Sequence, residues 1–148
     1  MINLIEIIVN KETLAKSSSD AITGNICFKV QNRWFPEPAW NDFVVIALTW
    51  WTDALLKINR VPAGAVYEFA FMDGPYLVRF SKISDDTMCM EFLIRRINSK
   101  ELLFDSQCSI EQFNKSLKTC VKMVITTIKS KGWVTLETKE LISRVNSL

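Results

Sequence analysis

The segment VYEFAFMDGPYLVRFSKISDDTMCMEFLIRRINSKELLFD, residues 66–105, decides the fold class of this chain. Aromatic and β-branched residues recur in four short runs, a pattern typical of strands. The expected strands are residues 66–72, 76–83, 87–97 and 101–105. Only the turns Asp73-Gly74-Pro75, Asp85-Asp86 and Asn98-Ser99-Lys100 separate them. Strands joined by such short turns run antiparallel, so the segment predicts an antiparallel meander.

A helix is predicted immediately before the meander, over residues 42–59. Asn41 and Asp42 suit its first turn, and Pro62 prevents it from continuing. Its polar side chains fall on one narrow stripe, which consists of Asp42, Thr49, Asp53 and Lys57. The rest of its circumference is apolar, so we expect a core helix whose polar stripe faces solvent.

Trp50 and Trp51 form an unusual pair in this helix. Neighbouring helix positions point about 100° apart, so the two indoles do not share one face. We expect both in the core, because aromatic side chains dominate core burial. The alternative is a pocket lined by Trp34, Trp40 and one of the pair, although no set of converging polar groups accompanies these residues.

Residues 34–40, WFPEPAW, form a segment that we call the lead. Pro36 and Pro38 each disfavour helical backbone in the residue before them. We therefore expect the lead to be irregular. Core formation does not explain its two tryptophans.

The two ends of the chain supply the remaining elements. Residues 3–9 and 25–31 are predicted strands, and the polar, Ser-rich residues 11–24 are a predicted loop. A capping pattern at Ser109 introduces a helix up to residue 131, and residues 136–145 form a short final helix. The order β-β-α-β-β-β-β-α-α predicts a single α+β domain over residues 1–148. Its expected architecture is a mainly antiparallel sheet of about six strands with helices packed on one face.

Composition excludes several kinds of catalytic site. The chain has no histidine, which removes the commonest general base and the commonest zinc ligand. Asp42 and Asp53 are about 16 Å apart along the predicted helix, too far for a pair of catalytic carboxylates. The sequence also has no glycine-rich phosphate loop. We therefore predict a protein that is not an enzyme and that has no metal site and no cofactor.

The cysteines and the hydropathy of the chain predict its cellular location. The four cysteines are Cys27, Cys89, Cys108 and Cys120, and no two form a C-x-x-C pair. Nothing resembles a signal peptide, so we expect a cytoplasmic protein with reduced, mostly buried thiols. The uninterrupted apolar run Phe43–Trp51 is far shorter than the roughly 20 residues of a membrane span. The net charge is only +2, so neither nucleic acid nor a membrane is an expected partner.

Part of the chain resembles immunity proteins of bacterial polymorphic-toxin and contact-dependent growth inhibition systems. The resemblance spans residues 34–80 and rests on FPEPAWNDF, the double-tryptophan helix and the FMDGPYLVRF hairpin. It implies a cytoplasmic bacterial protein that binds one cognate toxin domain, with nucleases among the candidate toxins, and blocks it without catalysis. Such proteins have many unrelated folds, so no functional residue transfers by position. We expect a monomer or a weak dimer.

Candidate interface residues therefore come from physical reasoning. Aromatic side chains are enriched at the centres of interfaces. Residues 34–108 carry ten acidic against seven basic side chains, which would complement a basic toxin. The candidate partner-binding residues are Trp34, Glu37, Trp40, Asp42, Trp51, Asp53 and Asp73. The alternative function is a small-ligand-binding or structural domain with an aromatic pocket near Trp34 and Trp40.

Overall fold

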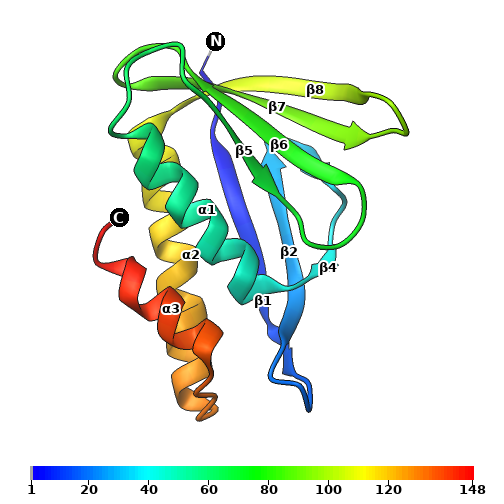
Figure 1. Cartoon of the computed structure of the whole chain (residues 1–148), viewed down its shortest axis with the longest axis vertical. Helices are drawn as coiled ribbons and strands as arrows, with labels where there is room; N and C mark the ends of the chain where they lie inside the picture. The colour runs from blue at the N-terminus through cyan, green and yellow to red at the C-terminus, as the bar shows by residue number, and fades with distance from the viewer. Residues whose placement is uncertain (1) are drawn as a thin grey trace.

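The computed structural model describes residues 2–148 and confirms the α+β class (Figure 1). Within these residues the chain forms two antiparallel sheets of four strands each and three helices, whereas the sequence predicted one sheet of about six strands. The helices are α1 (Val44–Ile58), α2 (Ile110–Ser130) and α3 (Leu136–Val145). None of them is long and apolar enough to span a membrane.

The predicted meander forms one of the two sheets, with its strands in chain order. The strands are β5 (Val66–Ala70), β6 (Tyr76–Lys82), β7 (Thr87–Arg95) and β8 (Lys100–Ser109). Phe69, Phe80 and Phe92 are fully buried on its inner face. β8 is longer than expected and leads directly into α2. The local alternation of side chains was therefore a sufficient signal for this half of the fold.

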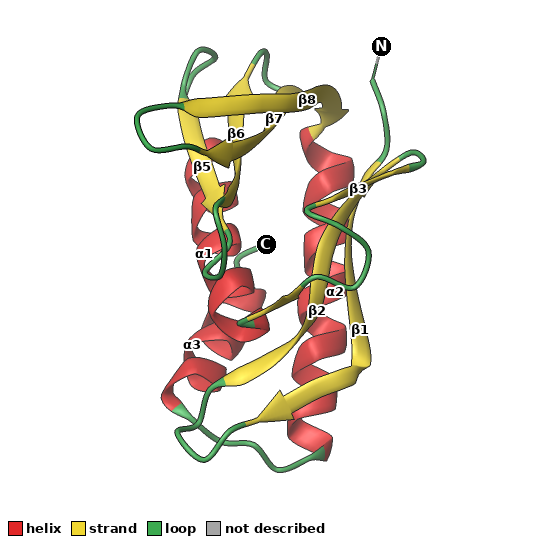
Figure 2. Ribbon diagram, turned by 90° about the vertical axis from the view of Figure 1, so that its right-hand side faces the viewer, coloured by secondary structure: helices red, strands yellow, loops and turns green. Residues whose placement is uncertain are grey.

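The second sheet corrects two predictions. Its strands are β1 (Ile5–Lys16), β2 (Ile22–Val30), β3 (Arg33–Phe35) and β4 (Asn41–Asp42), and β1, β3 and β4 all pair with β2. The prediction of a loop over residues 11–24 holds only for residues 17–21, because β1 continues to Lys16 and β2 begins at Ile22. Figure 2 shows these two strands running together along most of the molecule. Burial of Leu14 and Ile22 stabilises this end of the hairpin despite its polar composition.

The lead is more regular than expected at its start, and a second short strand follows it directly. In β3, Phe35 pairs with Phe28 of β2, and in β4, Asp42 pairs with Gly24 of the same strand. Strands of three and two residues are too short for side-chain alternation to reveal them. Pairing with β2 therefore holds the lead against the sheet.

The helix α1 lies in the core, but its polar stripe is not solvated as predicted. Asp42, just before the helix, is fully buried, and Thr49 is 6% exposed, whereas Lys57 is exposed. The Thr49 hydroxyl donates a hydrogen bond to the carbonyl of Val45, which satisfies it inside the core. The spacing of polar residues along the helix therefore did not show whether their side chains face solvent or a buried hydrogen-bond partner.

The tryptophan pair divides between interior and surface. Trp51 is fully buried and its indole N–H donates to the carbonyl of Ala70 at 3.0 Å, whereas Trp50 is 45% exposed. The expectation that both are core residues was therefore wrong for Trp50, although the 100° divergence of the two indoles is as predicted.

The other two helices begin at side-chain caps. At the start of α2 the Ser109 hydroxyl accepts from the backbone N–H of Gln112, as the capping pattern predicted. At the start of α3, Thr135 and Thr138 form a reciprocal capping box. Most of the buried apolar side chains, from both sheets and all three helices, form one cluster.

Candidate functional site

Three of the seven candidate partner-binding residues are either buried or already ion-paired. Trp51 is fully buried, so as folded it has no surface for a partner to contact. Asp53 is half-exposed and its Oδ1 accepts from Nε of Arg144 on α3 at 2.7 Å. Asp42 is also fully buried. The other four, Trp34, Glu37, Trp40 and Asp73, lie in the lead or in the β5–β6 turn.

Asp42 holds the lead, the start of α1 and the β5–β6 turn together. Its Oδ1 accepts from the backbone N–H of Phe43 at 2.7 Å and of Met72 at 3.2 Å. Its Oδ2 accepts from the indole N–H of Trp40 at 3.0 Å and from the backbone N–H of Asp73 at 3.1 Å. These four donors compensate the carboxylate for its complete burial. Asp42 is therefore a positioning residue within the fold.

Trp40 packs the lead onto the β5–β6 turn. Its ring lies 5.1 Å from that of Tyr76, edge to face. Two of its ring carbons lie 3.0 Å from where a Cβ would stand on Gly74, whose φ is +69°. Only glycine meets both the positive φ and this close approach without strain. The turn is consequently packed against the C-terminal end of the lead.

We use the name lead surface for the accessible residues of the lead and of the turn that packs against it, which are Trp34, Glu37, Pro38, Met72 and Asp73. Glu37, Pro38, Met72 and Asp73 are exposed and Trp34 is half-buried. Trp34, Pro38 and Ala39 cover a hollow of about 190 Å³ over β2. Nζ of Lys29 lies 5.2 Å from the Trp34 ring centroid, within cation–π range. The lead surface therefore combines an aromatic ring, carboxylates and apolar groups on a fixed backbone.

The thiol beneath the lead is protected. Cys27 lines the hollow, and burial raises its pKa, although a hydrogen bond with the backbone of Ala39 partly opposes this shift. Burial also raises the pKa of Cys108 and of Cys120 to about 12. The four cysteines are free and all but Cys89 are buried. The buried thiols are therefore protonated at neutral pH and are poor nucleophiles.

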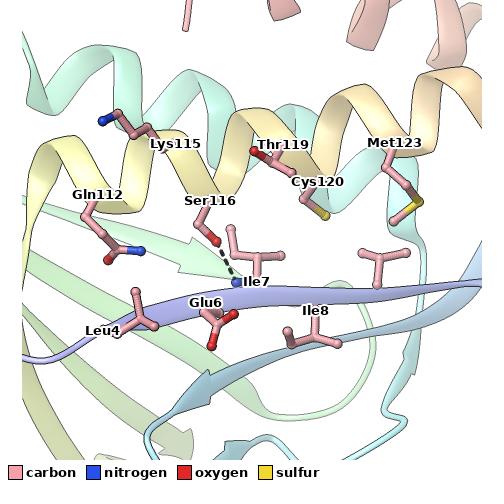
Figure 3. A pocket seen from close by; sticks show the side chains of 11 residues that line it. Leu4, Glu6, Ile7, Ile8, Gln112, Lys115, Ser116, Thr119, Cys120 and Met123 are labelled. Carbon is pink, nitrogen blue, oxygen red and sulfur yellow. Dashed lines mark hydrogen bonds between the residues drawn. The ribbon is translucent and has the colours of Figure 1, made fainter.

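A second hollow, which the sequence did not indicate, lies between β1 and α2 (Figure 3). This groove has a volume of about 480 Å³, and Leu4, Ile8, Cys120 and Met123 are among the residues that line it. Ile8 also lines the hollow beneath Trp34, so the two hollows adjoin. Alternation of side chains along β1 could have predicted an outward Ile8, but the position of α2 beside it could not.

The acidic and thiol groups at these surfaces lie apart from one another in the described part of the chain. Within residues 2–148, the Cys, Asp and Glu side chains do not gather in a group of three or more that could hold a metal ion. Glu37 and Asp73 are exposed and belong to separate turns. What this arrangement offers is an exposed segment whose backbone is held by Asp42 and by pairing with β2.

Comparison of the chain with models of protein families, with curated proteins and with solved structures gives no match.

Proposed function

We propose that this protein is an immunity-type inhibitor that binds a toxin domain through the lead surface and blocks that domain in the cytoplasm. The observation that carries the proposal is the buried Asp42 carboxylate, whose four hydrogen bonds order an exposed segment rich in aromatic and acidic side chains. A segment that is already ordered loses little conformational entropy on binding, which favours tight association.

The composition of the lead surface agrees with this role. Trp34 is a half-buried aromatic residue of the kind that dominates binding energy at interfaces. Glu37 and Asp73 are exposed carboxylates that would attract a basic toxin and accelerate encounter. Trp40 and Asp42 would act through the backbone that they hold.

A small ligand beside Trp34 is the alternative, and its pocket is small for that purpose. The hollow of about 190 Å³ is below the roughly 300–1,000 Å³ of most ligand sites. Trp40 packs against Tyr76 and does not line this hollow. The geometry therefore favours a protein partner over a small molecule.

The test is co-expression with the C-terminal domain of a toxin encoded by a neighbouring gene, scored by bacterial survival and by co-purification; the proposal requires such a gene to be present. Wild-type protein should rescue growth and co-purify with the toxin. Trp34→Ala combined with Glu37→Arg should lose at least about 100-fold in affinity, because an aromatic anchor and a charge partner are removed together.

Asp53→Arg is the matched control, because Asp53 pairs with Arg144 between α1 and α3, outside the lead surface. It should rescue as well as wild type. Killing in the presence of wild-type protein, with no co-purification, would refute the immunity function. Rescue lost with Asp53→Arg but retained by the Trp34/Glu37 variant would place the interface elsewhere.

A further inference from the structure

The groove between β1 and α2 has walls of opposite charge. Glu6 lies on the β1 wall and Lys115 on the α2 wall (Figure 3). The uncharged Ser116 lies between them. The Ser116 hydroxyl accepts from the backbone N–H of Ile7 at 3.1 Å, which closes the floor of the groove. Apolar side chains fill the length of the groove on both sides, among them Leu4, Ile8 and Met123.

Neither charge is neutralised by a buried partner. Within residues 2–148, Glu6 makes no ion pair. Lys29 stands directly opposite Glu6 on β2, but its Nζ lies over the Trp34 ring. Among the residues that the structure describes, Lys115 pairs only with Glu111, one turn earlier on the helix surface, and both side chains are at least three-quarters exposed. Such an exposed pair contributes little, so Lys115 remains available.

We propose that this groove is the contact between two copies of this chain, related by a two-fold axis. In a two-fold interface, a contact between residue i of one copy and residue j of the other occurs twice. When the two-fold axis runs along the groove, the two walls exchange places, so a groove with one acid and one base on opposite walls is complementary to itself in charge. Glu6 of each copy then faces Lys115 of the other, and the apolar residues between them are covered.

Leu4 supplies the apolar group that such a contact needs. It is 50% exposed at the end of the groove, just before β1 begins. The neighbouring Ile2 is 56% exposed. A stable dimer usually buries about 800 Å² on each partner, more than one shallow groove provides, so the expected dissociation constant is in the range of about 10–100 µM.

The proposal is independent of toxin binding and is tested on the full chain alone. Sedimentation velocity from about 5 to about 500 µM should show wild-type protein passing from monomer to dimer. Glu6→Lys and Lys115→Glu should each weaken dimerisation at least about 10-fold, because each places like charges opposite one another. Leu4→Asp should do the same by placing a charge in the apolar contact. Lys139→Glu, on the exposed side of α3, is the control and should dimerise as wild type.

Mixing the two single variants gives the sharpest result. A heterodimer of Glu6→Lys with Lys115→Glu has two attractive contacts, so the mixture should dimerise with an affinity within about 3-fold of wild type. Its formation also shows that both variants are folded. A wild-type protein that stays monomeric over this range, a dimer unaffected by both single reversals, or a mixture that stays monomeric would overturn the proposal.

Discussion

The carboxylate of Asp42 accepts a hydrogen bond from the backbone N–H of Asp73 at 3.1 Å, although 31 positions separate the two residues. Through this bond the start of α1 and the β5–β6 turn share one buried acceptor. The same carboxylate oxygen accepts from the indole of Trp40, so the lead is attached at this point as well. The lead surface therefore depends on one residue that no partner can reach.

Replacing Asp42 by Ala should cost about 2–4 kcal/mol of the free energy of unfolding, because four donors lose their acceptor inside the protein. Urea denaturation followed by circular dichroism measures the change. Asp53→Ala is the control and should cost less than about 1 kcal/mol, since its pair with Arg144 is partly exposed. Equal losses for the two variants would contradict the positioning role of Asp42.

The two neighbouring tryptophans should respond very differently to truncation. Trp51→Ala should cost about 3–5 kcal/mol, because it empties a fully buried site and removes the bond to Ala70. Trp50→Ala should cost less than about 1 kcal/mol, because its side chain is 45% exposed. Chemical denaturation of both variants checks the contrast, and a loss at Trp50 comparable to that at Trp51 would refute it.

Lys82 is a buried cation that closes the end of α1. Its Nζ donates to the carbonyls of Ile58 at 3.2 Å and Val61 at 2.9 Å. The residue as a whole is only 7% exposed. A cation at this end of a helix also interacts favourably with the helix dipole. Lys82→Met keeps the apolar stem and should cost about 1–3 kcal/mol, measured by thermal or urea unfolding. Lys57→Met, exposed in the last turn of the same helix, should leave stability nearly unchanged.

Glu137 should make stability depend on pH. Burial raises its pKa, and the nearby carboxylates of Asp20 and Glu140 raise it further, while a hydrogen bond with the backbone of Ile22 opposes them. Because the pKa is higher in the folded state, the stabilising contribution is present at acid pH. It is lost as the pH rises from the ordinary glutamate value of 4.5 through the raised value.

Glu137→Gln should therefore be more stable than wild type at neutral pH by a few tenths of a kcal/mol, roughly the size expected for a solvent-screened group. The difference should disappear near pH 4, where wild-type Glu137 is also protonated. Thermal unfolding of both proteins across this pH range gives the result. Glu12→Gln is the control, because Glu12 is exposed and is not among the groups that shift the Glu137 pKa. A gain that persists unchanged at low pH would show that ionisation is not its cause.

Local patterns were sufficient where local physics decides the structure. Alternation along residues 66–105 predicted the β5–β8 meander, and helical spacing with the Ser109 cap predicted α2. They were insufficient where a distant partner compensates an unfavourable local composition. The Ser-rich hairpin end depends on burial of Leu14 and Ile22, and β3 and β4 exist only through pairing with β2.

The candidate site shows the same division. The sequence predicted that core formation does not explain the two tryptophans of the lead. This was wrong for Trp40, which packs against the core, whereas Trp34 and Glu37 remain partly or fully accessible. Residue type could not show that Asp42 is buried, because a carboxylate prefers solvent unless several donors converge on it. Those donors lie up to 31 positions away, at Met72 and Asp73.

The sequence by itself thus determined the α+β class, the antiparallel meander, the two long helices and the unusual character of the lead. Only the tertiary structure decided that the strands divide into two sheets, which tryptophan of the pair is buried, and that a groove forms between β1 and α2. The physical reason is the distance along the chain over which each interaction acts. Periodicity reports which face of an element is apolar, whereas pairing and burial depend on contacts between residues far apart in the chain.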